Sequence, residues 1–223
     1  MDSSLNQLTY DSLKKDILIF ALKPGDTVSA AKIADRYNVS RTPARESLVK
    51  LESEGLVDII PQSKSVISKI DLDKARQEWF IRTSLEISMV DTFFAKVKEA
   101  DIEEMKKYNE VMHKLSRESK DHENCYRYLV ADNDFHAVTY RASGEYMAAS
   151  VISNTMAHYS RVRFLTDLDD FYQNRTVTGH SELIQLVENK DIEGYRKALK
   201  IHLGHILNDI QDLQEKYPDF FVQ

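Results

Sequence analysis

The sequence has little of what marks secreted and membrane proteins. It contains one cysteine, Cys125, which excludes a disulfide within the chain and fits a reducing compartment. Residues 1–4 lack the basic and then apolar pattern of a signal peptide. No apolar run approaches the roughly 20 residues that a membrane-spanning helix needs. We therefore expect a cytoplasmic protein without a membrane partner.

Glycine and proline are also scarce. Six glycines and four prolines in 223 residues leave few helix breaks, so long helices are favoured over a many-stranded sheet. The predicted fold class is mainly α. It consists of an N-terminal winged helix-turn-helix followed by a C-terminal all-α antiparallel helical bundle.

The formal net charge of −6 is unevenly distributed. Residues 1–70 carry 10 basic and 9 acidic side chains, whereas the remainder carries 20 basic and 27 acidic ones. An acidic body repels DNA, so we expect any DNA contact to come from the N-terminal part. The predicted domains are residues 1–70, which bind DNA, and residues 71–223, which bind an effector and dimerise.

A short helix with two arginines at its start is the most informative feature of the first domain. Thr42 and Pro43 predict its beginning, because threonine caps helices and proline suits the first helical position. Arg41 and Arg45 then lie at the N-terminal end, which can enter a DNA major groove, where guanidinium groups suit guanine edges or phosphates. Two arginines on an isolated helix would more simply be solvated; the neighbouring segments favour DNA binding.

The segment before this helix predicts a helix-turn-helix. Apolar residues recur with helical spacing over residues 5–22, and residues 23–26 form a turn. Ser29 can cap a second helix, and residues 38–40 connect that helix closely to the one at Thr42.

The segment after this helix predicts a wing. Gly55 suits a left-handed residue that closes the helix. Apolar residues within 57–59 and 66–70 then indicate two short strands around a polar turn at residues 61–64. Lys64 at the tip of this hairpin can reach a phosphate.

From residue 71 onward the sequence predicts a bundle without strands. We expect six helices, at about residues 72–97, 101–119, 122–142, 145–166, 171–189 and 191–216.

Four residues in this bundle have spacings that suit a metal site. Asp132 and His136 are four residues apart and share a helix face. His180 and His202 lie ten residues before and twelve after a turn near Lys190, at similar heights in an antiparallel helix pair. Imidazole and carboxylate ligands suit a divalent Zn, Ni, Mn or Fe ion. The alternative is that these residues are ordinary core or surface residues.

Two arginines are candidates for binding an effector. Arg82 lies on a mostly apolar helix, where a cation needs an anion, either a ligand or Glu86 four residues on. Arg163 lies on a helix that can face the same cavity, together with His158 and Arg161.

The residues of the first domain resemble the GntR family of bacterial transcription regulators. The similar segments are residues 22–26, 33–34, 39–48 and 51–57. The helical remainder resembles the FCD effector domain of the FadR-like subfamily, in its six-helix VanR-type variant. The residues that carry this second resemblance are Arg82, Leu85, Glu86, Asp132, Phe135, His136, Ser143, Gly144, His180, His202 and Leu203.

The resemblance implies a homodimer that binds a double-stranded DNA operator, with a metal and a small organic acid in the helical domain. Two positions depart from the family pattern. The family usually has an arginine where this chain has Ala31, with Lys32 as the nearest substitute, and a glycine at the wing tip, which this chain lacks. Arg41, Thr42 and Arg45 are therefore expected to carry more of the DNA recognition.

These observations predict a ligand-responsive transcription regulator, more often a repressor in this family. One alternative is a metal-dependent hydrolase or oxygenase fused to a DNA-binding segment, because a metal with open positions can activate water. A further alternative is a regulator whose metal is structural or is itself the signal.

Overall fold

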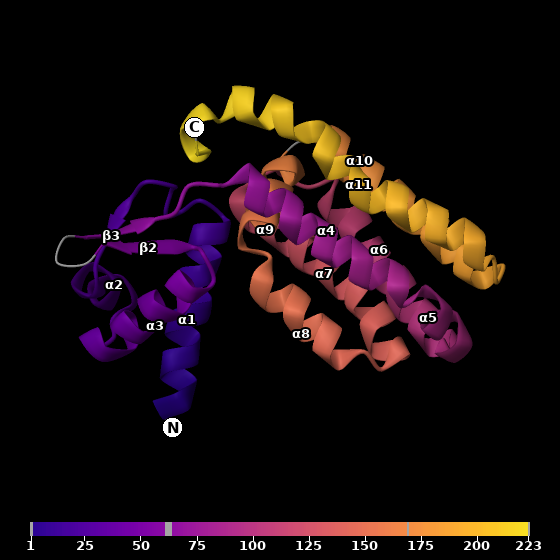
Figure 1. The fold of residues 1–223 in the computed structure, drawn as a ribbon, viewed down its shortest axis with the longest axis horizontal. Helices are drawn as coiled ribbons and strands as arrows, with labels where there is room; N and C mark the ends of the chain where they lie inside the picture. Colours follow the sequence, from indigo (N-terminus) through magenta and orange to yellow (C-terminus); the bar gives the residue numbers. More distant parts are fainter. Residues whose placement is uncertain (1, 61–63, 169, 223) are drawn as a thin grey trace.

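The computed structural model describes residues 2–60, 64–168 and 170–222, which form two modules side by side (Figure 1). The N-terminal module contains three helices and a small sheet. Its elements are α1 (Asp2–Leu18), β1 (Thr27–Val28), α2 (Ala30–Tyr37), α3 (Arg41–Ser53), β2 (Val57–Ile60) and β3 (Lys64–Ile67).

Local signals in the sequence account for the boundaries of α2 and α3. The Ser29 hydroxyl accepts a hydrogen bond from the backbone N–H of Lys32, so it caps α2 as predicted. Asn38 ends α2 in the left-handed conformation (φ 53°), and Gly55 follows α3 with φ 78°. The three helices bury a common apolar core that includes Leu13, Ile33 and Leu51.

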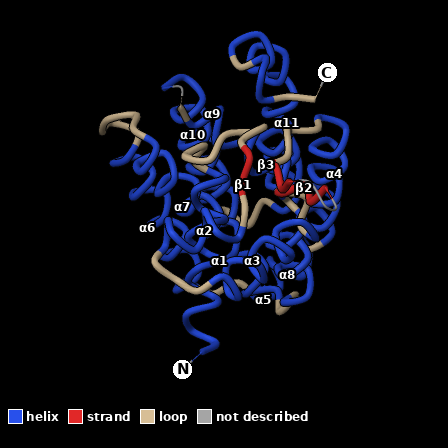
Figure 2. The backbone as a smooth tube through the Cα atoms, turned by 90° about the vertical axis from the view of Figure 1, so that its left-hand side faces the viewer, coloured by secondary structure: helices blue, strands red, loops and turns tan. Residues whose placement is uncertain are grey.

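The sheet contains one strand that the sequence did not predict. β1 pairs antiparallel with β3, and β3 pairs antiparallel with β2, with Val57 opposite Ile67 and Ile60 opposite Lys64. The second wing strand ends at Ile67 rather than Ile70, and three residues of the predicted turn, 61–63, lie outside the described part of the chain. Figure 2 shows the three strands within a predominantly helical molecule.

The prediction of six helices in the second module was wrong. Among the described residues after 71, eight α-helices and a short 3-10 turn, η1, are present. They are α4 (Leu72–Ser88), α5 (Val90–Lys96), α6 (Glu99–Leu115), α7 (His122–Ser143), α8 (Tyr146–Thr155), α9 (Ala157–Asp167), α10 (Asp170–Glu188), α11 (Ile192–Lys216) and η1 (Pro218–Phe220).

The two additional helices arise from interruptions at methionines. The first predicted helix is divided at Met89, and the fourth at Met156, where ψ of 39° leaves the helical region. Both methionines are buried, and Phe93, in the helix after Met89, packs against Tyr195. The mainly α fold class is nevertheless confirmed.

A second apolar cluster joins the two modules. Phe20, which follows α1, packs against Phe164 of α9 and Phe220 of η1. Ile70, in the linker, pairs with Phe221 in an isolated parallel bridge. The junction between the modules is therefore a packed core.

Candidate metal centre and nucleic-acid interface

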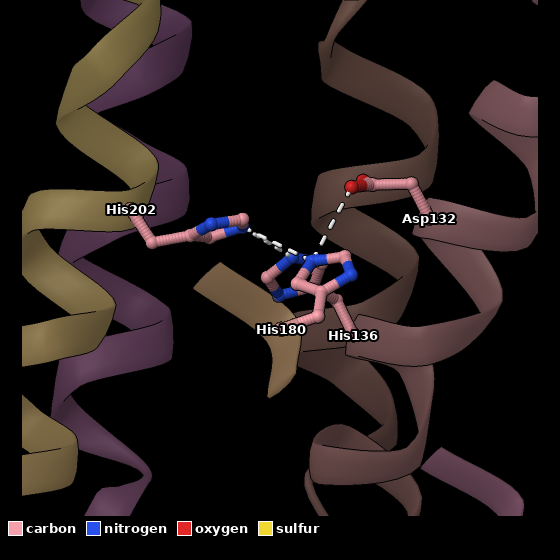
Figure 3. A group of neighbouring side chains, drawn as sticks. All are labelled: Asp132, His136, His180 and His202. Atoms are coloured by element: carbon pink, nitrogen blue, oxygen red, sulfur yellow. Dashed lines mark hydrogen bonds and ion pairs between the residues drawn. The ribbon is translucent and has the colours of Figure 1, made fainter. Parts of the chain in front are cut away.

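The structure brings together the four residues that the sequence proposed as metal ligands. Asp132 and His136 lie one turn apart on α7, His180 lies on α10, and His202 lies on α11; their side chains point toward one another (Figure 3). One nitrogen or oxygen atom from each residue lies within 4.8 Å of those from the others. The spacing argument thus predicted the grouping correctly.

Hydrogen bonds alone do not satisfy all the nitrogens of this group, because Nε2 of His202 faces two other ring nitrogens. Nε2 of His202 lies 3.1 Å from Nε2 of His180 and 3.3 Å from Nε2 of His136. Oδ1 of Asp132 lies 3.5 Å from Nε2 of His180. A single ring proton serves one such contact, whereas a cation accepts lone pairs from all three nitrogens. Three imidazoles and one carboxylate therefore fit a divalent transition metal.

Burial keeps two of these histidines in the form that binds metals. It lowers the pKa of His202 to about 3 and lowers the pKa of His180 strongly as well. Burial alone raises the pKa of Asp132, but the nearby Arg163 guanidinium outweighs this and holds that pKa below its usual range. Neutral imidazole and ionised carboxylate are the forms that coordinate a metal.

Glu86 is a residue of this site that the sequence interpretation missed. Its Oε2 lies 2.8 Å from Nδ1 of His136, and its Oε1 accepts hydrogen bonds from Tyr140 (2.6 Å) and Arg82 (2.7 Å). A carboxylate on the far nitrogen of a ligating histidine fixes the ring's orientation and tautomer. The sequence analysis had named Glu86 as a partner for Arg82 and among the residues that resemble the FCD domain, but not as a neighbour of the histidines. The ion pair between Arg82 and Glu86 is present.

Two further contacts shape the histidine cluster. Phe135 stacks on His180 with ring centroids 3.8 Å apart and planes 10° from parallel. Gly179 lies so close to His202 that a Cβ atom there would be 2.8 Å from Nδ1 of His202. The absence of a side chain at position 179 therefore gives the His202 ring its space.

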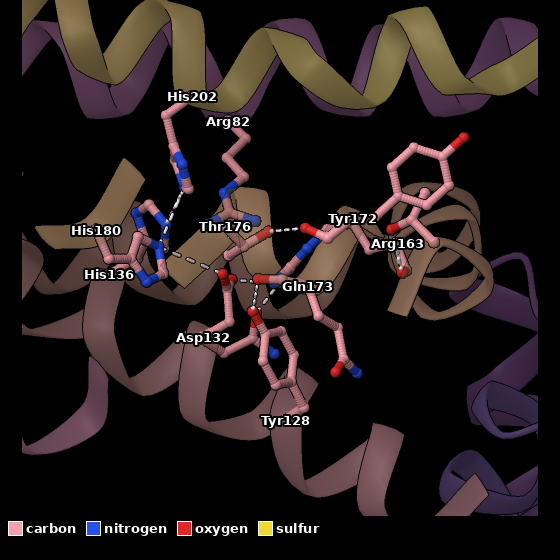
Figure 4. A network of polar contacts seen from close by, with 12 residues as sticks. Arg82, Tyr128, Asp132, His136, Arg163, Tyr172, Gln173, Thr176, His180 and His202 are labelled. Carbon is pink, nitrogen blue, oxygen red and sulfur yellow. Dashed lines mark hydrogen bonds and ion pairs between the residues drawn. The ribbon is translucent and has the colours of Figure 1, made fainter. Parts of the chain in front are cut away.

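A cavity of about 500 Å³ adjoins the cluster. Arg82, His136 and Arg163 all line it, so both arginines proposed for effector binding face the same space. Arg163 is hydrogen-bonded to Oδ2 of Asp132 (Figure 4). It also donates a 2.7 Å hydrogen bond to Asn133. Because Oδ1 of Asp132 faces the histidines, Arg163 connects the cavity directly to the proposed metal ligands.

The helix proposed to read DNA begins two residues earlier than predicted. α3 starts at Arg41, and its N-cap is Ser40, which makes no side-chain capping bond; Thr42 lies in the first turn and is not the cap. The side chains of Arg41, Thr42 and Arg45 are all exposed. The N-terminal end of α3 is therefore free to enter a DNA major groove with both arginines, as the prediction requires.

The two candidate lysines are exposed as well. Lys32 lies in the first turn of α2, and its Nζ is 3.2 Å from the backbone oxygen of Thr27. Lys64 begins β3, beside the turn residues that lie outside the described part.

Comparison with known families agrees with both modules. Residues 5–67 match the description "Bacterial regulatory proteins, gntR family", and residues 79–205 match the FCD domain. The chain is a GntR-family transcription regulator with an FCD domain. The predicted family is thus confirmed, whereas the six-helix variant is not.

Relatives of this GntR regulator align along nearly its whole length. An HTH-type transcriptional regulator in an unstable DNA locus of Streptomyces ambofaciens is 27% identical, covering 96% of this chain and 88% of the relative. The HTH-type transcriptional repressor RspR of Escherichia coli K12 is 25% identical, with coverages of 98% and 94%. The solved structure of E. coli McbR/YncC shares the fold, with a TM-score of 0.77, 20% identity and coverages of 96% and 98%.

These matches do not favour the alternative of a metal-dependent hydrolase or oxygenase.

Within the described residues of this GntR regulator, every helix is too short or too polar to cross a bilayer.

Proposed function

We propose that this regulator is a repressor that binds a double-stranded operator as a homodimer and responds to a small organic acid held beside a divalent metal. One observation carries the proposal: the Asp132 and histidine cluster adjoins a cavity that Arg82 and Arg163 also line. A cation and guanidinium groups beside the same cavity favour a carboxylate. The protein would act by binding rather than by turnover.

In this proposal Asp132, His136, His180 and His202 hold the metal, and Zn, Ni, Mn and Fe all suit these ligands. When bound, the ion supplies a positive charge that a carboxylate can ligate. Arg163 supplies a second, bidentate donor for the same group. Glu86 holds His136 in place, and the burial of Asp132, His136 and His180 strengthens the attraction between these charges.

On the DNA side, Arg41, Thr42 and Arg45 would contact bases and phosphates, with Lys32 and Lys64 as additional phosphate contacts. We assign residues 1–70 to DNA binding and residues 71–223 to effector binding and dimerisation. A single winged helix reads a short half-site, so two copies spaced by about one turn of DNA would provide specificity. The relative RspR, which is named as a repressor, supports repression rather than activation.

The helix α9 supports a route between the two modules. Arg163 contacts Asp132 on the side of the proposed metal site. Two residues away, the fully buried Arg161 donates a 2.6 Å hydrogen bond to the backbone oxygen of Ser68. His158 accepts one from the backbone N–H of Asp71 at 3.0 Å. An acid that draws Arg163 away from Asp132 would therefore move the helix that holds the linker.

The test begins with selection of a DNA site from random duplexes by the metal-loaded protein. Sedimentation should show a dimer with and without that DNA. Operator affinity is then measured with metal, with chelator, and with small carboxylic acids added to the metal-loaded protein. The proposal predicts that an acid weakens DNA binding only when metal is present. A monomer on DNA, or an operator affinity that no acid alters, would contradict it. Loss of DNA binding on chelation without any acid effect would identify the metal as the signal.

A further inference from the structure

The effector cavity extends beyond the helical module. α7 and α8 form two of its walls, but Lys14 and Leu18 of α1, from the DNA-binding module, line it too. A smaller cavity of about 30 Å³ shares five of its lining residues and reaches Glu54 and Leu56. The shared residues are Lys14, Leu18, Ser153, Met156 and Ser160.

Lys14 occupies a defined position between the two sites of the molecule. His136 lines only the larger cavity and Glu54 only the smaller one, so Lys14 lies between the metal cluster and the end of α3. Its side chain is 24% exposed and lines both cavities. It is therefore a cation that a ligand can reach from the proposed metal site.

The current partner of Lys14 belongs to the recognition helix. Lys14 Nζ lies 2.8 Å from Oε2 of Glu54, the residue that caps the C-terminus of α3. Tyr10 donates a 2.5 Å hydrogen bond to Oε1 of the same carboxylate. These two contacts hold the C-terminal end of α3 against α1.

We propose that the effector is an acid with a second anionic group, and that Lys14 binds this second group. Lys14 then determines which acids bind, according to their length. The inference rests on the proposed function, in which the first carboxylate binds beside the metal and Arg163. A ligand that engages Lys14 competes with Glu54 for it, so occupation of the cavity loosens the contact between α1 and the recognition helix.

The competition predicts a difference between matched acids. Metal-loaded protein is titrated by calorimetry with dicarboxylates from succinate to pimelate and with monocarboxylates of the same chain length. The best dicarboxylate should bind about tenfold more tightly than its monocarboxylate counterpart, since one charge-assisted hydrogen bond contributes on that order. The variant Lys14→Met should abolish this preference and retain monocarboxylate affinity. The variant Lys14→Arg should restore the preference.

Two further variants test the mechanism. Lys15→Met is the matched control, because Lys15 is the next residue on α1 but pairs with Glu123 outside the cavity; the preference should persist. Glu54→Gln removes the competing carboxylate. Dicarboxylates should therefore bind more tightly, and the affinity for monocarboxylates should stay the same.

The outcomes separate the two proposals. Equal affinities for both acid series, unaffected by Lys14→Met, overturn the role of Lys14 and leave the proposed function standing. If Lys14→Met weakens both series together, Lys14 has only a structural role, and the inference is likewise overturned. If the metal-loaded protein binds none of the acids, both proposals fail.

Discussion

Nδ1 of His136 lies 2.8 Å from Oε2 of Glu86, and this contact turns the opposite nitrogen of the ring toward His202. It connects α4 to the proposed metal ligands of α7, α10 and α11. Burial opposes ionisation of Glu86, but His136 and Arg82 outweigh it and hold its pKa below the usual range. Glu86 is therefore a fixed negative charge behind the cluster.

Replacing this charge should weaken metal binding. Glu86→Gln is expected to lower metal affinity about 10- to 100-fold, since the carboxylate no longer orients His136. Competition with a chromophoric chelator measures this. Because the variant also leaves Arg82 without its buried partner, Arg82→Met/Glu86→Gln serves as the second variant. If the double variant bound metal as tightly as the wild type does, Glu86 would have no role in metal binding.

Gly179→Ala should disturb the same cluster from the opposite side. A Cβ atom there would lie 2.8 Å from Nδ1 of His202, so the ring must move and metal affinity should fall. Gly204 provides the matched control, because it is also helical and a Cβ there meets no atom within 4 Å. Gly204→Ala should keep metal affinity and gain about 0.5–1 kcal/mol in the free energy of unfolding. Equal metal affinities for the two variants would refute this account of Gly179.

DNA binding should depend on Arg45. If its guanidinium contacts a base edge, Arg45→Ala should weaken operator binding by about 1–3 kcal/mol and relax specificity at one base pair. A smaller, sequence-independent loss with a reduced salt dependence would indicate a phosphate contact instead. Fluorescence anisotropy at several salt concentrations distinguishes the two. Arg117→Ala, at an exposed position of the helical module, is the control, and an unchanged Arg45→Ala affinity would exclude Arg45 from the interface.

The junction between the modules should be sensitive to acid through His158. Its Nδ1 lies 3.0 Å from both the backbone N–H of Asp71 and a guanidinium nitrogen of Arg161, and burial followed by Arg161 lowers its pKa from 6.5 to about 4. The unfolded chain therefore takes up a proton below about pH 6.5 that the folded protein excludes. This contribution to stability is present above pH 6.5 and is lost as the pH falls toward 4.

Urea unfolding at about pH 7 and pH 5 measures this loss. His158→Gln should show a smaller decrease in the free energy of unfolding than the wild type, since glutamine takes up no proton. His113→Gln, at an exposed position, should behave as the wild type does. Equal decreases in all three proteins would contradict the assignment.

The sequence predicted the features that depend on local spacing. Asp132 and His136 share a face through helical geometry alone, and the distances of His180 and His202 from one turn placed them at the same height. The Ser29 cap likewise depends only on neighbouring residues. These positions could be found because each relation spans one helix or one helix pair.

Other features depend on packing that no local pattern records. The breaks at Met89 and Met156 contain neither glycine nor proline, and they occur where the chain turns to bury side chains. Thr42 and Ser40 are both capable helix caps two residues apart, so the sequence could not separate them. Glu86 had a sufficient local explanation in Arg82, and its contact with His136, 50 residues away, appears only in three dimensions.

The pairing of Ile70 with Phe221 has a consequence for how the molecule can be divided. The backbone N–H of Ile70 donates to the carbonyl of Phe220, and that of Val222 donates to the carbonyl of Ile70, so residues 220–222 are hydrogen-bonded to the linker. The linker is therefore held by residues near the C-terminus as well as by its own neighbours in sequence. If the chain were cut near residue 70, the N-terminal fragment would lose the contacts that residues 220–222 make with the linker. The C-terminal fragment would keep residues 220–222 but lose their partner, so neither fragment would retain the complete junction.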